Sequence, residues 1–253
     1  MHLLIIDAMN LIRRVYAAVE GNELAAEATM TRSLAIIHGA ASRSEATHWV
    51  MVFEDHHPTW RHELWSEYKA GRSPMPEALE HILGDIRKYL EMNGVHTFNL
   101  SGWEADDIAA TLAVKAGAAG LAVTLLSTDK GFCQLVNSST RVLNHFDRLW
   151  WDEEQVRERW GFEPARLPDF WALTGDQTNH LPGVAGIGAK GAGQVLDSCQ
   201  TLDRALAWPD LAPERYRKAL KEGWQSALIT RELARLRTDV PLGISLSALR
   251  ASR

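Results

Sequence analysis

Three short apolar runs divide the first 130 residues of the chain. Residues 3–6 read L-L-I-I, residues 48–53 read H-W-V-M-V-F, and residues 122–127 read A-V-T-L-L-S. Runs of this length without polar alternation predict strands that are buried on both faces of a parallel sheet. The run T-R-V-L-N-H-F at residues 140–146 predicts one further strand.

Between these runs the apolar positions recur with helical spacing. The pattern predicts helices over about residues 28–41, 76–92 and 104–119. Strands that alternate with helices are typical of an α/β domain with a parallel sheet. We therefore expect an α/β domain over residues 1–150.

The character of the chain changes after residue 150. The run W-D-E-E-Q-V-R-E-R-W-G predicts a helix that ends at Gly161, and no strand is expected beyond about residue 147. Residues 151–253 therefore predict a smaller helical region, with loops at 174–191 and 208–214.

Composition adds limits on compartment and class. The 253 residues are 46% hydrophobic, contain no apolar run long enough to span a membrane, and begin without the charged segment of a signal peptide. Cys133 and Cys199 have no metal-like spacing, so we expect two free thiols in a reducing cytoplasm. The net charge of −5 does not exclude a nucleic-acid partner, because clustered carboxylates lower the total without removing basic patches.

Acidic residues follow each of the first three apolar runs. Asp7 follows the first run, Glu54 and Asp55 follow the second, and Asp129 follows the third. In open α/β sheets, ligands bind beyond the carboxyl ends of the strands. The alternative is that these are ordinary acidic residues of surface loops, but three strand ends that carry acids to one edge favour a site.

A second acidic group lies in the run S-G-W-E-A-D-D, which contains Glu104, Asp106 and Asp107. Ser101 and Glu104 also match a helix capping box, and acids in a first turn complement the helix dipole. On a helix, positions 104 and 107 share one flank and Asp106 points elsewhere. Two carboxylates about 4 Å apart repel by roughly 4 kcal/mol at an effective dielectric near 20. A divalent cation would offset that repulsion, which predicts metal-dependent phosphate chemistry.

A glycine-rich segment, L-P-G-V-A-G-I-G-A-K-G, matches G-x-G-x-x-G at Gly186, Gly188 and Gly191. A dinucleotide site needs a strand directly before the glycines, and here a polar loop precedes them. A hairpin between two helices fits better, because its backbone amides and Lys190 can bind a DNA phosphate.

The segment 61–72 combines cations with aromatic residues. Arg61, Lys69 and Arg72 lie near Trp65 and Tyr68, just after the acids at 54–55. Such a segment suits a single-stranded flap that stacks its bases on aromatic rings. The alternative is a loop of ordinary solvated basic residues.

Together these motifs resemble the bacterial 5′-nuclease, or flap endonuclease, superfamily, especially its stand-alone exonuclease IX group. The resemblance covers about residues 3–238 and rests on L-L-I-I-D-A, V-F-E-D, R-H-E-L-W-S-E-Y-K-A-G-R-S-P-M-P, E-A-D-D, S-T-D-K-G and G-D-Q-T-N-H-L-P-G-V-A-G-I-G-A-K. It implies a PIN-like α/β domain followed by a helix-three-turn-helix region that binds DNA.

The resemblance implies two Mg²⁺ sites. The first would use Asp7, Glu54 or the adjacent Asp55, Glu104 and Asp106. The second would use Asp107 and Asp129 with two further aspartates. The chain departs from the family here: D-K-D becomes Asp129-Lys130-Gly131, and the D-x-x-D-N motif keeps Asp176 but has Asn179 in place of its second aspartate. We therefore expect one firm Mg²⁺ site and a second that is weak or DNA-dependent.

The resemblance also implies a K⁺ ion in the hairpin and a set of DNA contacts. The K⁺ would bind backbone carbonyls at Leu173, Thr174, Pro182, Val184 and Ile187. Lys69 would stabilise charge on the transition-state phosphate. The expected DNA contacts are Arg14, Lys69, Arg72, Gly186, Ile187, Gly188, Ala189, Lys190 and Gly191.

The expected function is Mg²⁺-dependent cutting of 5′-flap or other branched DNA. The alternative is a flap-DNA-binding protein with negligible catalysis, because the second metal site is depleted. An RNA-cleaving PIN-like nuclease is disfavoured by the hairpin, which suits duplex DNA.

Overall fold

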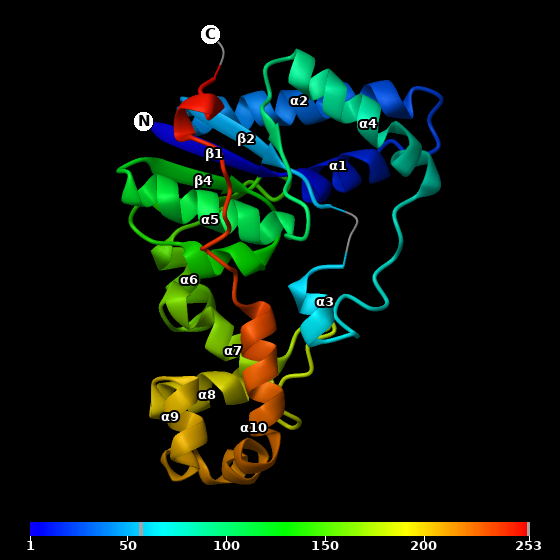
Figure 1. The fold of residues 1–253 in the computed structure, drawn as a ribbon. Helices are drawn as coiled ribbons and strands as arrows, with labels where there is room; N and C mark the ends of the chain where they lie inside the picture. The colour runs from blue at the N-terminus through cyan, green and yellow to red at the C-terminus, as the bar shows by residue number, and fades with distance from the viewer. Residues whose placement is uncertain (56–57, 252–253) are drawn as a thin grey trace. The chain divides into compact units, whose positions relative to one another are not determined.

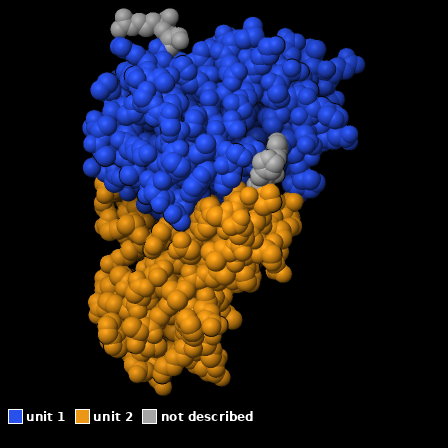
Figure 2. Space-filling model, viewed as in Figure 1, with its two compact units in different colours: residues 1–57, 73–152, 237–253 blue, residues 58–72, 153–236 orange. Residues whose placement is uncertain are grey.

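The computed structural model describes residues 1–55 and 58–251, which belong to two compact units (Figure 2). The first unit comprises residues 1–57, 73–152 and 237–253, and the second comprises residues 58–72 and 153–236. The boundary expected at residue 150 lies close to one of the points where the chain passes between the units. None of the described helices combines the length and apolar character that a bilayer crossing needs.

A six-stranded sheet forms the centre of the first unit. Its strands are β1 (His2–Asp7), β2 (His48–Val52), β3 (Thr97–Phe98), β4 (Ala122–Leu126), β5 (Thr140–Asn144) and β6 (Leu149–Trp151). Their order is β3-β2-β1-β4-β5-β6, and all neighbours are parallel except β5 and β6. The strands predicted from the four apolar runs are confirmed.

The expectation that no strand follows residue 147 is wrong. Strand β6 returns antiparallel to β5 after a short turn, and Leu143 pairs with Trp150. It has only three residues, too few for a period-2 pattern to be recognised, and its place depends on pairing with β5. The two-residue strand β3 was not predicted for the same reason.

The helices of the first unit are α1 (Ala8–Ala17), α2 (Ala25–Ser44), α4 (Glu77–Met92) and α5 (Ala105–Ala118), with 3₁₀ turns η1 (Lys130–Leu135) and η4 (Leu246–Leu249). The predicted helices at 28–41, 76–92 and 104–119 are confirmed as α2, α4 and α5. Helix α1 was not predicted. It begins directly after β1, where Asp7 is both the last strand residue and the N-cap, since its carboxylate accepts from the Asn10 amide at 3.2 Å.

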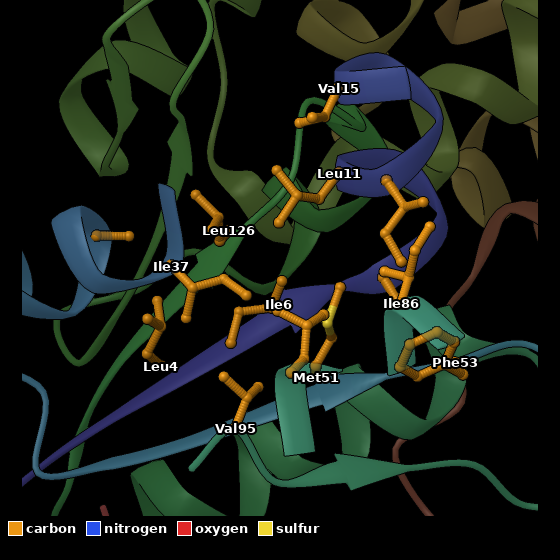
Figure 3. Packing of buried hydrophobic residues seen from close by; sticks show 14 of the residues in the cluster. Leu4, Ile6, Leu11, Val15, Ile37, Met51, Phe53, Ile86, Val95 and Leu126 are labelled. Atoms are coloured by element: carbon orange, nitrogen blue, oxygen red, sulfur yellow. The ribbon is translucent and has the colours of Figure 1, made fainter. Parts of the chain in front are cut away.

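Alternate residues of β1 face opposite layers of the unit. Leu4 and Ile6 pack in one core with residues of α1, α2 and α4, among them Leu11 and Ile37 (Figure 3). Helix α5 packs against β1 and β4, and Figure 1 draws it across the sheet from α2 and α4. Because Leu3, Leu4, Ile5 and Ile6 are all fully buried, the strand is covered on both faces, as its unbroken apolar run predicts.

The strand order locates a binding edge. From β1 the chain builds β2 and β3 on one side, then crosses to β4 and β5 on the other side. The order therefore reverses between β1 and β4. Loops at the carboxyl ends of such a strand pair diverge and leave a crevice, where open α/β sheets bind ligands.

The second unit is helical. It contains α3 (Trp60–Leu64), α6 (Glu153–Trp160), α7 (Leu167–Thr174), α8 (Ala189–Cys199), α9 (Leu202–Ala207) and α10 (Glu214–Ala234), with 3₁₀ turns η2 (Pro164–Arg166) and η3 (Pro209–Leu211). Its described residues include no strand, so the strand that a dinucleotide site needs directly before the glycines is not found there. The segment between α7 and α8 is the helical hairpin that the glycine pattern predicted.

Candidate active site

Asp7 lies at the strand-order reversal and is linked to the loop after β4. Its carboxylate accepts from the Ser127 hydroxyl at 2.8 Å as well as from the Asn10 amide. The Ser127 hydroxyl oxygen in turn accepts from the Asp129 amide at 3.0 Å. These bonds hold the ends of β1 and β4 in one geometry and orient two of the predicted acids.

The electrostatics of Asp7 indicate a crowded acidic site. The pKa of Asp7 is raised to about 6, first by burial and then by the charges of Asp129 and Glu54, against the opposing effect of the Ser127 and Asn10 hydrogen bonds. A nearby cation would reverse this effect, because an opposite charge favours the ionised carboxyl. The structure therefore brings Asp7, Asp129 and Glu54 into one electrostatic neighbourhood.

The acids of α5 differ in exposure. Glu104 and Asp107 are buried, at 1% and 0% exposed, whereas Asp106 is half-buried. Glu104 is the N-cap of α5 but makes no side-chain cap hydrogen bond, so the capping box with Ser101 does not form. The Asp107 carboxylate accepts from the Arg237 amide at 2.9 Å. Buried carboxylates without such partners are costly, so these positions need donors or a cation.

These acids fit a cation that keeps most of its own waters. Among the residues that the structure describes, no three His, Cys, Asp or Glu side chains are already arranged around one point that could hold a metal. Mg²⁺ commonly binds one or two carboxylates and completes its shell with water and substrate phosphate. Oxygen donors alone, together with the raised pKa of Asp7, suit such a hard cation.

The two departures from the family pattern have specific local consequences. The Asp129 carboxylate accepts from the Gly131 amide at 2.7 Å, and a Cβ at Gly131 would lie 3.1 Å from that oxygen. In the second unit, the Asn179 side-chain amide donates to the Asp176 carboxylate at 2.5 Å. An aspartate at 179 could not donate this bond. The residues that depart from the pattern therefore provide or permit hydrogen bonds to the remaining acids.

The segment 58–72 contains one structural arginine and two further cations, Lys69 and Arg72, that lie near the hairpin. Contrary to its prediction as a flap contact, Arg61 is 1% exposed and donates to the carbonyls of Leu233 and Arg235, at 2.8 and 3.0 Å. It therefore satisfies the C-terminal end of α10. The Tyr68 ring is buried in a small cluster with Leu181 and Leu233, and the Trp65 ring packs against that cluster. Both rings therefore serve packing, which replaces the expected role in base stacking.

Lys69 and Arg72 are more exposed than Arg61. Lys69 is half-buried and has a positive φ of 57°, a conformation uncommon for a residue with a side chain. Its amide donates to the Asn179 carbonyl at 3.0 Å. The exposed Arg72 donates to the side-chain oxygen of Asn179 and to the Thr178 carbonyl. Strained backbone of this kind is concentrated at functional sites.

The hairpin between α7 and α8 brings two backbone segments unusually close. A Cβ at Gly183 would lie 2.3 Å from the Gly175 nitrogen, and one at Gly175 would lie 2.5 Å from the Leu181 carbonyl. Only glycine permits this approach. The carbonyls proposed for K⁺ lie here, at Leu173, Thr174, Pro182, Val184 and Ile187. Two of them already accept bonds, Leu173 from the Val184 amide and Val184 from the Ile187 amide.

The predicted DNA contacts of the hairpin divide by exposure. Gly186, Gly188, Ala189 and Lys190 are exposed at the start of α8. The Ile187 side chain is buried, and a Cβ at Gly191 would lie 2.9 Å from the Tyr216 ring. Those two positions can reach DNA only through their backbone. In the first unit, Arg14 is exposed, with its guanidinium 5.7 Å from the centre of the Phe146 ring.

Comparison with known proteins assigns the chain to a class. Residues 2–161 match the N-terminal resolvase-like domain of 5′-3′ exonucleases, and residues 162–253 match their C-terminal SAM fold. The chain therefore belongs to the 5′-3′ exonuclease family, as its motifs predicted.

Individual relatives narrow the resemblance. Flap endonuclease Xni of Photorhabdus laumondii is 43% identical over 251 residues, which cover 98% of this chain and 97% of that protein. Flap endonuclease Xni of Yersinia enterocolitica is 42% identical, with 100% and 99% covered. The phage T5 D15 protein, crystallised with metal ions, has the same fold at 20% identity, with a TM-score of 0.78 over 92% of this chain and 89% of that one.

Proposed function

We propose that this protein is a structure-specific flap endonuclease that hydrolyses a phosphodiester of 5′-flap or branched DNA and depends on Mg²⁺. The observation that carries the proposal is the acidic edge at the β1–β4 reversal, where the pKa of Asp7 is raised by burial and by Asp129 and Glu54. The relatives named flap endonuclease Xni support the substrate, and T5 structures with metal ions or with DNA support a metal-dependent reaction.

The acids of the first unit would hold the cation. Asp7, Glu104 and Asp106 would be its principal ligands, with Glu54 or Asp55. When bound, Mg²⁺ would supply Lewis-acid activation of water and neutralise charge on the phosphate. Ser127 and Asn10 would keep the Asp7 carboxylate oriented through the hydrogen bonds described above.

Three cationic residues would act on the phosphates of the substrate directly. Water adds to phosphorus, one bridging P–O bond breaks, and negative charge accumulates on the phosphate oxygens. Lys69 would stabilise that charge, and its backbone is held by the hydrogen bond from its amide to the Asn179 carbonyl. Arg72 and Arg14 would contact neighbouring phosphates.

The second Mg²⁺ and the K⁺ belong to the same proposal. Asp107, Asp129 and Asp176 would contribute to a second ion that binds weakly or only with DNA, because Gly131 and Asn179 supply no carboxylate. The hairpin carbonyls would hold K⁺, so that the exposed backbone from Gly186 to Lys190 meets duplex phosphates. Two buried free thiols support a reducing, cytoplasmic setting.

The test is cleavage of a labelled 5′-flap duplex by the wild type and by Asp106→Ala, with Mg²⁺ and with EDTA. Binding of the same DNA is recorded in parallel. We expect cutting near the junction that requires both Mg²⁺ and Asp106, while the variant still binds. Tight binding without Mg²⁺-dependent cutting would instead establish the flap-binding alternative, which the Asn179–Asp176 pairing favours.

A further inference from the structure

A basic pocket lies on the hairpin formed by β5 and β6. It has a volume of about 310 Å³ and is lined by Arg43, Leu143, His145, Arg148 and Trp150. Leu143 pairs with Trp150 across the two strands, so these side chains lie side by side on one face of the sheet. The alternation of strand residues puts Arg141 on that face too, where its guanidinium lies 4.7 Å from the centre of a Trp150 ring.

The charge of this pocket is not balanced by acids. Arg43 contacts the Nδ1 atom of His145 at 2.8 Å. Burial, together with the charges of Arg43 and Arg148, lowers the pKa of His145, so its ring is neutral and accepts that bond. The nearby Asp147 carboxylate accepts instead from the Asn144 side chain, at 2.7 Å. None of the ion pairs between described residues involves Arg43, Arg141 or Arg148.

The pocket lies near the acidic edge, two strands away from the end of β1. Strand β5 is the neighbour of β4, and the Ser127 amide donates to the Leu143 carbonyl at 3.2 Å. Ser127 is also the residue that donates to Asp7. Since neighbouring strands are about 4.8 Å apart, the end of β5 lies about 10 Å across the sheet from the end of β1. At roughly 3.4 Å of rise per nucleotide, that distance corresponds to about three nucleotides.

The backbone of Arg148 gives an independent indication. Arg148 has a positive φ of 54° in the turn between β5 and β6, where its amide donates to the His145 carbonyl. Glycine and asparagine adopt this conformation more readily than arginine does. An arginine at this position therefore has a less favourable backbone conformation than glycine or asparagine would have, and it provides a guanidinium at the pocket.

We propose that this pocket binds an internal phosphodiester of the DNA substrate, about three nucleotides from the scissile bond. Guanidinium groups bind phosphate oxygens in a fork geometry, and here two of them reach one cavity with a neutral imidazole between. The inference rests on the proposed function, because it needs branched DNA bound with its scissile bond at the acidic edge.

The test compares DNA binding by the wild type, Arg148→Asn and the double variant Arg43→Ala/Arg148→Asn. Asparagine keeps the turn, so the melting temperature of Arg148→Asn should equal or exceed that of the wild type. Arg32→Ala is the matched control, because Arg32 is an exposed arginine of the same helix as Arg43 and lies outside the pocket. Affinity for a 5′-flap duplex is measured by fluorescence anisotropy in EDTA over a series of salt concentrations.

Each lost phosphate contact should reduce the slope of log K, the association constant for DNA, against log salt concentration by about 0.7–0.9. At 0.1 M salt this raises Kd about 6-fold for one lost contact and about 40-fold for two. Arg32→Ala should bind as the wild type does. With Mg²⁺, the variants should show a raised KM and an unchanged kcat.

Modified DNA identifies the group that is bound. Neutral methylphosphonate linkages are placed one at a time near the junction. One linkage, about three nucleotides from the cut, should weaken DNA binding by the wild type but should not change DNA binding by the double variant. Removing the terminal 5′-phosphate should have no such selective effect; if it does, the pocket binds a phosphate monoester and the proposal is wrong. Variants that bind with wild-type affinity and salt slope would also overturn it. Wild-type protein that binds flap DNA but never cuts it would refute the proposed function alone.

Discussion

Replacing Asp7 with asparagine tests whether the carboxylate at the end of β1 favours a bound cation and lowers the stability of the metal-free protein. The pKa of Asp7 rises from its usual 3.8 to about 6, first because of burial and then because of Asp129 and Glu54. A difference of about two pKa units corresponds to roughly 3 kcal/mol. This is the penalty that the ionised carboxylate imposes on the folded, metal-free protein above pH 6.

The sign of the effect depends on pH. The folded-state pKa of this carboxyl is raised, so its stabilising contribution is present below about pH 4 and is lost as the pH rises through about 6. Asparagine carries no charge at either pH, but it replaces one of the two accepting oxygens and loses a hydrogen bond worth about 1 kcal/mol. The net gain is therefore about 2 kcal/mol at pH 8, or roughly 4–8 °C in melting temperature for a chain of this size.

Thermal unfolding in EDTA at pH 8 and pH 4 measures this difference for the wild type, Asp7→Asn and the control Asp197→Asn, which changes an exposed aspartate on α8. We expect Asp7→Asn to be more stable than the wild type at pH 8 and slightly less stable at pH 4. Mg²⁺ should raise the melting temperature of the wild type more than that of Asp7→Asn, and the variant should not cut DNA. An Asp7→Asn protein that melts below the wild type at pH 8 in EDTA would refute the reasoning.

Three further substitutions test parts of the second unit. Asn179→Asp removes the donor to Asp176 and puts two carboxylates together, so the metal-free protein should lose about 1–3 kcal/mol; an unchanged melting temperature in EDTA would contradict this. Gly183→Ala puts a Cβ 2.3 Å from a backbone nitrogen and should cost at least 1–3 kcal/mol and weaken duplex binding, whereas Gly193→Ala, with open space around it, should do neither. Arg61→Met leaves two carbonyls at the end of α10 without their donor and should lower stability by about 2–4 kcal/mol; an unchanged denaturant midpoint would show that Arg61 is dispensable.

Local pattern was sufficient to predict the centre of the fold. Strands β1, β2 and β4 are largely apolar runs, and the geometry of a parallel sheet brings the acids that follow them to one edge. Strands β3 and β6 have two and three residues, and their conformation depends on pairing with β2 and β5. No window of sequence contains that information.

The features of the site that the sequence did not predict depend on contacts between residues far apart in the chain. Asp107 accepts from an amide 130 residues away, at Arg237, and Arg61 donates to a carbonyl 172 residues away, at Leu233. Arg61 was predicted as a flap contact because the helix end that it satisfies is remote in the chain. The basic pocket combines Arg43 from α2 with residues of the β5–β6 hairpin, about 100 positions later. Ser127, directly after β4, could have been predicted to orient a site acid, since a hydroxyl next to a carboxylate often does so.

The two carboxylates that the proposed second metal site lacks connect stability with catalysis. Carboxylates that share a metal site repel when the ions are absent, and the charges of Asp129 and Glu54 add to burial in raising the pKa of Asp7. In the second unit Asn179 donates to Asp176, and in the first unit Gly131 lets Asp129 accept its amide without a side chain beside the carboxylate. Both changes lower the repulsion in the metal-free protein, and both remove a ligand for the second ion. If catalysis persists with one protein-bound Mg²⁺, DNA phosphates must supply the missing oxygen ligands, so activity should depend on Mg²⁺ more steeply at low DNA concentration than at saturation.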